Sequence, residues 1–305
     1  MTVATVCVKF WITGAHLQSM IEGVLAGINY AASFTLMHFL HFTLAAKQPA
    51  MTAPTLAREL DDIGHEEGVR RFVVSVVALI RTQAAAISGN VLAVLPVCLA
   101  VQLGAHAWLH ADVISVEKAH ATLRSFSLLG PTPFYAGLTG VLHRVGDAIA
   151  WHRRLRLTLG VAGAARLARF CRTNVAGVIG NVGLGMMLGL VPAIVSAFAF
   201  GFEVRHVTLS AGSIGVAVGV IGERALGSGE LWWAIAGVLS MAVLNVAVSF
   251  ALAFTMAVRS RALRPTKVRA LIAAIWRAVR ANPASLIWPQ AASGQDGHAP
   301  GSRSH

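Results

Sequence analysis

Long apolar runs separated by polar connectors are the main pattern along this chain of 305 residues. Apolar runs of about 18 residues or more are typical of helices that cross a membrane. Four such runs occur, at about 21–46, 84–109, 175–200 and 231–258. A shorter run, 72–80, cannot cross alone, and Arg81 separates it from the second long run. The pattern predicts an all-α fold, a polytopic bundle of transmembrane helices.

Two further apolar elements are short. As a helix, the 15 residues 128–142 reach about 22 Å, less than a hydrocarbon core of about 30 Å. Extended to 128–150, this element crosses only by carrying polar residues into the interface. In one model, 128–150 spans and the other short element, 207–222, does not. This model places 19 Lys and Arg on one side of the membrane and 5 on the other, with Arg144 not counted. The positive-inside rule favours that model. We therefore expect five spans, with 207–222 re-entrant or packed inside the bundle.

Two stretches of the sequence resemble each other. "RTQAAAISGNV" at 81–91 matches "RTNVAGVIGNV" at 172–182, and "EKAHATLRSFS" at 117–127 matches "EVRHVTLSAGS" at 203–213. We predict two repeat units, about 81–142 and 172–222, each a long span followed by a short element. Short elements at corresponding positions of two halves are a pointer to a transport site. The alternative is a duplication that serves helix packing alone.

The C-terminal part differs from this transmembrane domain, which we place at 1–265. Residues 266–288 are expected to form an amphipathic helix on the cytoplasmic membrane surface, in contact with anionic lipids. Its apolar stripe is Val268, Leu271, Ile272, Ile275, Trp276 and Val279, and its cations off that stripe are Lys267, Arg269, Arg277 and Arg280. The tail 289–305, rich in Gly, Ser, Ala and Pro, is predicted to be disordered.

Composition supports a membrane protein. Hydrophobic residues make up 56% of the chain and charged residues 12%, about half of the roughly 25% of a soluble domain. The net charge of +12 fits cytoplasmic loops that meet anionic lipid, and less strongly a contact with DNA. Arg153, Arg154 and Arg156 are candidate residues for such a contact. The three cysteines lie far apart, so neither a disulfide framework nor a metal site is implied, and no cofactor is expected. We expect a multi-pass protein of the bacterial inner membrane.

Polar residues inside the apolar runs are the candidate functional residues. Buried amides need partners, so Asn29, Asn90, Asn181 and Asn245 mark either helix contacts or a polar path.

The candidate histidines leave several interpretations open. His38 and His41 lie three residues apart and share one helical face. Three roles stay open for this pair: a proton relay, the start of a metal site, or hydrogen-bonded structural residues. His120 and His206 occupy matching repeat positions, where they would gate, bind an anion, or satisfy helix ends.

Several long stretches resemble one protein family. They include "GVLAGINYAASFTLMHFLHFTLAAKQPAMTAPTLA" (23–57), "AIAWHRRLR" (148–156), "GNVGLGMMLGLVPAI" (180–194), "EVRHVTLS" (203–210) and "LNVAVSFALAF" (244–254). The chain is similar, over residues 1 to about 288, to the bacterial membrane-protein family labelled site-specific recombinase. The resemblance implies a C-terminal half of such a protein, with an internal deletion between "LTGVL" and "HRVGDAIAWHRRLR".

The family label implies DNA strand exchange, but the residues give no support for that chemistry. A tyrosine-type enzyme needs a tyrosine nucleophile and cations around the phosphate. The two tyrosines, Tyr30 and Tyr135, both sit in apolar runs, and the sequence contains no H-x-x-R. Three classes of function stay open: a DNA-processing enzyme, a transporter, and a structural membrane protein.

Overall fold

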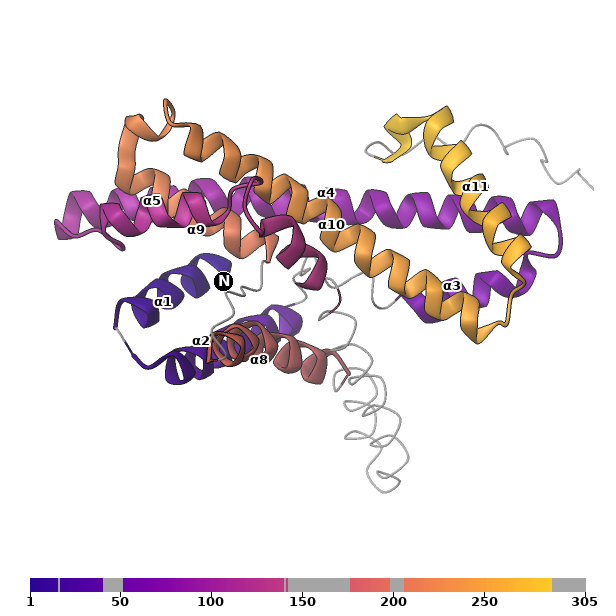
Figure 1. Cartoon of the computed structure of the whole chain (residues 1–305), viewed down its shortest axis with the longest axis horizontal. Helices are drawn as coiled ribbons and strands as arrows, with labels where there is room; N and C mark the ends of the chain where they lie inside the picture. Colours follow the sequence, from indigo (N-terminus) through magenta and orange to yellow (C-terminus); the bar gives the residue numbers. More distant parts are fainter. Residues whose placement is uncertain (16, 41–51, 140, 142–175, 198–205, 287–305) are drawn as a thin grey trace, which may run out of the picture.

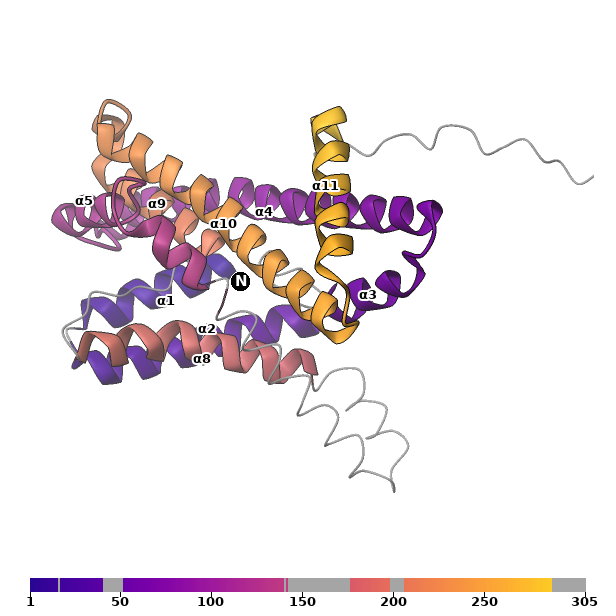
Figure 2. The ribbon, with the colours of Figure 1, turned by 45° about the vertical axis from the view of Figure 1, so that its right-hand side comes forward.

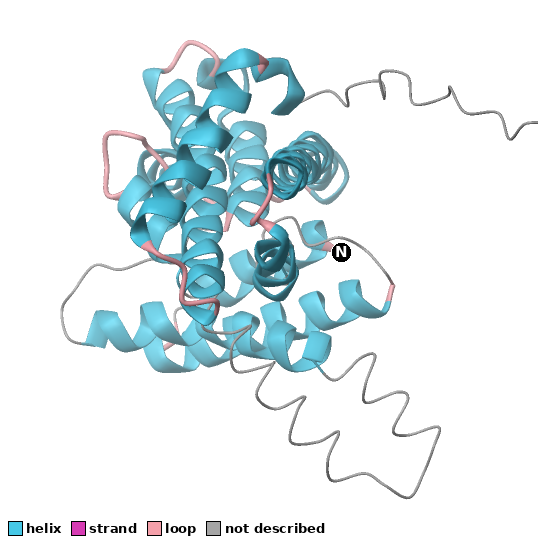
Figure 3. Ribbon diagram, turned by 90° about the vertical axis from the view of Figure 1, so that its right-hand side faces the viewer, coloured by secondary structure: helices cyan, strands magenta, loops and turns pink. Residues whose placement is uncertain are grey.

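The structure is a computed structural model that describes residues 1–15, 17–40, 52–139, 141, 176–197 and 206–286. All regular structure in these ranges is helical, which confirms the predicted all-α fold (Figures 1 and 3). Residues 132–139 form a helical stretch that carries no label. The labelled helices are α1 (Thr2–Gly14), α2 (Ser19–Phe39), α3 (Thr52–Glu59), α4 (Glu66–Leu109), α5 (Val116–Ser125), α8 (Ala176–Ala197), α9 (Val207–Ile221), α10 (Gly229–Ser260) and α11 (Pro265–Ala281), and the 3-10 turns are η2 (Leu60–Asp62), η4 (Gly222–Ala225) and η5 (Pro283–Leu286).

Two long antiparallel helices, α4 and α10, join the two ends of the molecule (Figure 1). At one end, Nδ1 of His120 in α5 lies 2.7 Å from Oε2 of Glu230 in the first turn of α10. At the other end, Nη2 of Arg261, just after α10, lies 2.6 Å from Oδ2 of Asp61, shortly before α4. We call these two regions the α5 end and the α3 end.

Helix α4 is continuous over 44 residues, so the short apolar run 72–80 and the long run from 84 belong to one helix, with Arg81 inside it. Arg and Gln are good helix formers, and a charged side chain interrupts an apolar run without ending a helix. At 1.5 Å per residue the helix is about 66 Å long, roughly twice the hydrocarbon core. It ends at His110, which adopts the left-handed conformation with φ 50°. Only part of α4 can therefore lie within a membrane.

Helices α2 and α8 pack antiparallel along glycine-rich faces. Gly23 near the start of α2 lies against Ala193 near the end of α8, and Ala31 lies against Gly185. A Cβ atom added to Gly185 would overlap the backbone of Ala31, and one added to Gly189 would also overlap the backbone of α2. Small residues four apart let helices in lipid approach this closely. The two backbones are therefore in direct contact.

Helix α9 is enclosed by other helices, and eleven of its 15 residues are buried. It runs parallel to α4, because its Gly212 lies against Val94 and Cys98 while its Gly219 lies against Gln102. It begins beside the middle of α4 and ends towards the α5 end, covering about 22 Å. We call α9 the buried half-helix. That 207–222 is re-entrant remains a prediction, because the preceding residues 198–205 lie outside the described ranges.

Four described helices, α2, α4, α8 and α10, are long and apolar enough to cross a membrane. They overlap four of the five runs expected to span, and the span bounds remain a prediction. Of the fifth, 128–150, the structure describes only 128–139 and 141, so this span remains a prediction. The tail 289–305 lies outside the described residues. The two repeat units also remain a prediction.

Large apolar side chains cover the outward faces of these helices. Leu92 on α4 is 74% exposed and Trp108 near its end is 86% exposed. Exposed tryptophans gather towards the α5 end, at Trp11, Trp108, Trp232 and Trp233, whereas Trp276 is exposed on α11 at the α3 end. The hydrophobic surface thus has an aromatic residue near each of its two ends.

Candidate functional site

A pocket of about 220 Å³ lies where the buried half-helix α9 begins. Its walls come from α1, α2, α4 and the start of α9, and its polar side chains include Asn90, His206 and Thr208. Most of the remaining wall is apolar, formed by residues such as Phe34 and Val94. Pockets for drug-sized ligands measure about 300–1,000 Å³, so this one suits water or a small solute.

Helix α9 positions two of the polar groups. His206 is the N-cap residue, only 2% exposed, and its ring lies 5.7 Å from the ring of Phe34, centroid to centroid. Thr208, in the first turn, is also buried. The helical hydrogen bonds of α9 begin with the Ser210 amide, which donates to the His206 carbonyl at 2.9 Å. The backbone amides of the first α9 residues carry partial positive charge, as at any helix N-terminus, and they lie at the pocket.

Helix α4 supplies the amide of the pocket. The sequence singled out Asn90 and His206 from different helices, and the structure brings both to one pocket. An amide, an imidazole and a hydroxyl can together donate and accept hydrogen bonds. The arrangement can therefore hold a small polar molecule within an otherwise apolar wall.

The other three candidate asparagines lie elsewhere. Asn29 Nδ2 donates to the carbonyl of Thr5 at 3.0 Å and so joins α2 to α1. Asn181 is buried on α8. Asn245, on α10, is 3% exposed, and neither atom of its amide has a hydrogen-bond partner among the described residues. Asn29 therefore makes a packing contact, one of the two roles expected for these residues.

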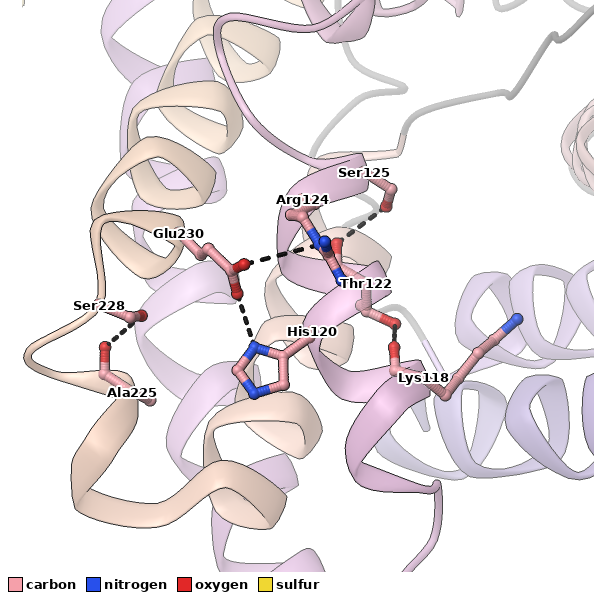
Figure 4. A network of polar contacts seen from close by, with 8 residues as sticks. All are labelled: Lys118, His120, Thr122, Arg124, Ser125, Ala225, Ser228 and Glu230. Atoms are coloured by element: carbon pink, nitrogen blue, oxygen red, sulfur yellow. Dashed lines mark hydrogen bonds and ion pairs between the residues drawn. The ribbon is translucent and has the colours of Figure 1, made fainter.

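The remaining candidate histidines are not in the pocket. His120 joins α5 to α10 through Glu230, whose other oxygen lies 3.6 Å from Arg124 Nε (Figure 4). His38 packs against the ring of Phe39, with centroids 5.7 Å apart. His41 lies outside the described residues. Within the described part of the chain no group of three or more His, Cys, Asp or Glu could hold a metal ion.

Four of the seven candidate cations lie among the described residues and three do not. Lys267, Arg269, Arg277 and Arg280 are exposed on α11. Arg153, Arg154 and Arg156 lie outside the described residues.

Sequence reasoning missed several residues that shape the pocket or the α5 end. Thr208 was not singled out because a hydroxyl in an apolar run gives only a weak signal. Gln102 was missed as well, although its Nε2 donates to Asp112 Oδ1 at 2.6 Å and its Oε1 accepts from the Val113 amide at 2.9 Å. The acidic residue just after the start of α10, Glu230, could have been recognised, because acidic side chains are favoured in a first helical turn.

A model of the site-specific recombinase family matches residues 1–289 of the chain. The chain belongs to the site-specific recombinase family. No match was found among curated proteins or among solved structures. The family resemblance expected from the sequence is thus confirmed over nearly the whole chain.

The two tyrosines of this family member lie in helices. Tyr30 is buried in α2, and its ring stacks near that of Phe34 at a centroid distance of 6.3 Å. Tyr135 lies in the helical stretch 132–139 beside the ring of Phe134. Strand exchange by a tyrosine requires the hydroxyl to meet a DNA phosphate. Tyr30, enclosed in helix packing, is not positioned for such an attack.

Proposed function

We propose that this member of the site-specific recombinase family is an integral, multi-pass protein of the bacterial inner membrane. The four apolar helices and their exposed side chains, such as Leu92, support this proposal. Soluble proteins rarely expose large contiguous apolar surfaces. Tryptophans are enriched where membrane proteins meet the headgroup region, and here they occur towards both ends.

The α3 end is the proposed cytoplasmic end. Cations gather there on α3, on the start of α4 and on α11, while the α5 end carries few. Cytoplasmic segments of membrane proteins are enriched in Lys and Arg. This orientation gives the chain a cytoplasmic C-terminal helix.

Within the membrane, we infer a transporter-like role for this core, and the buried half-helix carries the inference. A helix that begins in the middle of a bundle, beside a pocket with an amide, an imidazole and a hydroxyl, is typical of solute sites in transporters. Its first-turn amides add donors at the same place. The proposed ligand is a small, neutral or anionic polar solute.

Solute flux tests this role. The full chain is reconstituted into vesicles, and stopped-flow light scattering follows their volume after an osmotic step with urea, glycerol or glycine. We expect faster flux of at least one probe than in empty vesicles, and its loss with Asn90→Leu. The matched control is Leu92→Ala, which alters an exposed residue on the same helix. Vesicles that behave like empty ones with all three probes would exclude the role for these solutes.

A second candidate function is a role in DNA recombination, and the family match favours it. Because Tyr30 is enclosed, we propose DNA contact through the cations of the cytoplasmic end, without catalysis by this chain. Binding of duplex DNA to the solubilised chain, measured at 50 and 200 mM salt, tests this candidate. Several phosphate contacts would lower the affinity by orders of magnitude between these salt concentrations. An affinity that salt does not change would contradict it.

A further inference from the structure

Helix α11 packs on α4 beside the short apolar run 72–80, next to Arg81, which precedes the long apolar run. Figure 2 shows α11 crossing α4. Just after α11, the carbonyl of Ser285 accepts a hydrogen bond from Arg81 Nη1 at 3.5 Å. The apolar run of α4 begins three residues later, at Ala84. If the long apolar run of α4 crosses the membrane, α11 therefore lies at the membrane edge.

The apolar stripe of α11 is divided between two surroundings. Leu271 is 2% exposed and belongs to a core cluster with Phe72 and Phe254, against which Val268 and Ile275 also pack. About half of the stripe is therefore covered by α4 and α10 and is not available to a membrane. Packing on the protein fixes the orientation of the helix.

The other half of the stripe faces outward. Ile272 is 52% exposed and Trp276 is 57% exposed, one helical turn apart. Two cations lie beside them on the same side of the helix. The Arg280 guanidinium lies 5.1 Å from the centre of the Trp276 ring, and Arg269 precedes Ile272 by three residues. We call these four residues the α11 edge.

We propose that the α11 edge binds anionic headgroups of the lipid leaflet at the α3 end. An isoleucine and a tryptophan held at the membrane boundary suit the shallow interfacial region, where tryptophan is favoured. The guanidinium groups carry the charge complementary to lipid phosphates and bind them with several donors. This inference goes beyond the solute role, because it needs neither the pocket nor α9.

Lipid binding to the full chain in detergent tests the proposal. Native mass spectrometry measures the dissociation constants of phosphatidylglycerol and of phosphatidylcholine. Each arginine near an anionic surface contributes about a fivefold change in affinity, so Arg269→Gln with Arg280→Gln should weaken phosphatidylglycerol binding by roughly 25-fold. Binding of phosphatidylcholine should change little. The control removes two exposed cations at the α5 end, through Lys118→Gln with Arg224→Gln.

An equal loss in the control variant would mean that net charge, and not the α11 edge, decides binding, and would overturn the proposal. Unchanged phosphatidylglycerol binding in the test variant would overturn it as well. A second measurement does not depend on these variants. The fluorescence difference between the native chain and Trp276→Phe, in vesicles with brominated lipids, should be strongly quenched. An unquenched difference would place Trp276 against water or another protein and contradict lipid contact.

Discussion

At the scale of single residues, the asparagines of the apolar helices differ in their hydrogen bonds. The amide of Asn29 donates to a carbonyl of α1, whereas the buried amide of Asn245 has no partner among the described residues. A hydrogen bond contributes about 1 kcal/mol, while a buried amide without a partner costs about 1–3 kcal/mol. Two chemically identical side chains thus have opposite expected effects on stability.

Replacing each asparagine by leucine tests this difference. We expect Asn29→Leu to lower the free energy of unfolding by about 1 kcal/mol, because a bond between α1 and α2 is lost. Asn245→Leu should leave it unchanged or raise it, since an amide without a described partner becomes apolar. Thermal unfolding in detergent, followed by tryptophan fluorescence, measures both. A lower unfolding temperature for Asn245→Leu would mean that its amide is bonded.

The sequence located these polar residues but not their roles. His120 and His206 occupy matching positions, yet one lies at the partly exposed α5 end and the other in the pocket wall. Their surroundings depend on α10 and α2, which are distant in the chain. No pattern around either histidine contains that information.

At the scale of elements, the close contact of α2 and α8 depends on particular glycines. Gly189 faces the backbone of α2, whereas a Cβ atom on Gly183 would have no neighbour within 4 Å among the described residues. The apolar pattern predicted both helices. Which glycines face the partner could not be predicted, since the glycines of α8 lie on more than one side of the helix.

Substituting these two glycines separates packing from helix propensity. We expect Gly189→Leu to destabilise the chain by about 3 kcal/mol or more, because its side chain would overlap the α2 backbone. Gly183→Leu should be tolerated, since leucine is a better helix former than glycine by nearly 1 kcal/mol. Thermal unfolding and size-exclusion profiles of the two variants make the comparison. Equal loss in both would contradict the observed α2–α8 interface.

The attachment of α5 to α10 gives a second prediction for an element. Glu230→Gln removes the carboxylate that His120 and Arg124 share. Partly exposed ion pairs contribute about 1 kcal/mol or less, so the fold should persist while α5 detaches more often. Trypsin cleavage after Lys118 or Arg124 should become a few times faster. Glu117→Gln, with the same change of charge on α5 itself, should leave the cleavage rate unchanged.

At the scale of the whole molecule, two ion pairs show which connectors share an end. The Arg261–Asp61 pair places the segments before α4 and after α10 together, and the His120–Glu230 pair joins the opposite connectors. Counting cations along the sequence gave the same grouping, because charge patterning reflects topology directly. The division of the α11 stripe was not predictable, since helical periodicity does not distinguish a face covered by protein from one covered by lipid.

Cysteine labelling in intact cells tests this arrangement. In a chain without its native cysteines, Lys118→Cys and Arg224→Cys should react with a membrane-impermeant maleimide. Arg58→Cys and Arg269→Cys should react only after the membrane is made permeable, because the α3 end is the proposed cytoplasmic end. A reporter active only in the cytoplasm, fused after Pro289, should be active. Labelling of all four positions from outside would contradict the proposed membrane topology.

The enclosure of α9 also has a consequence for how the protein is made. Translocation machinery releases long apolar helices sideways into lipid as synthesis proceeds, but a 15-residue segment that is enclosed by neighbours has no lipid-facing surface to drive that release. Its neighbours α1, α4 and α5 are synthesised before it, and α10 is synthesised after it. We therefore expect the half-helix to enter a groove already formed by earlier helices, and α10 to close that groove. We expect assembly to be sequential, with α10 completing the enclosure of α9.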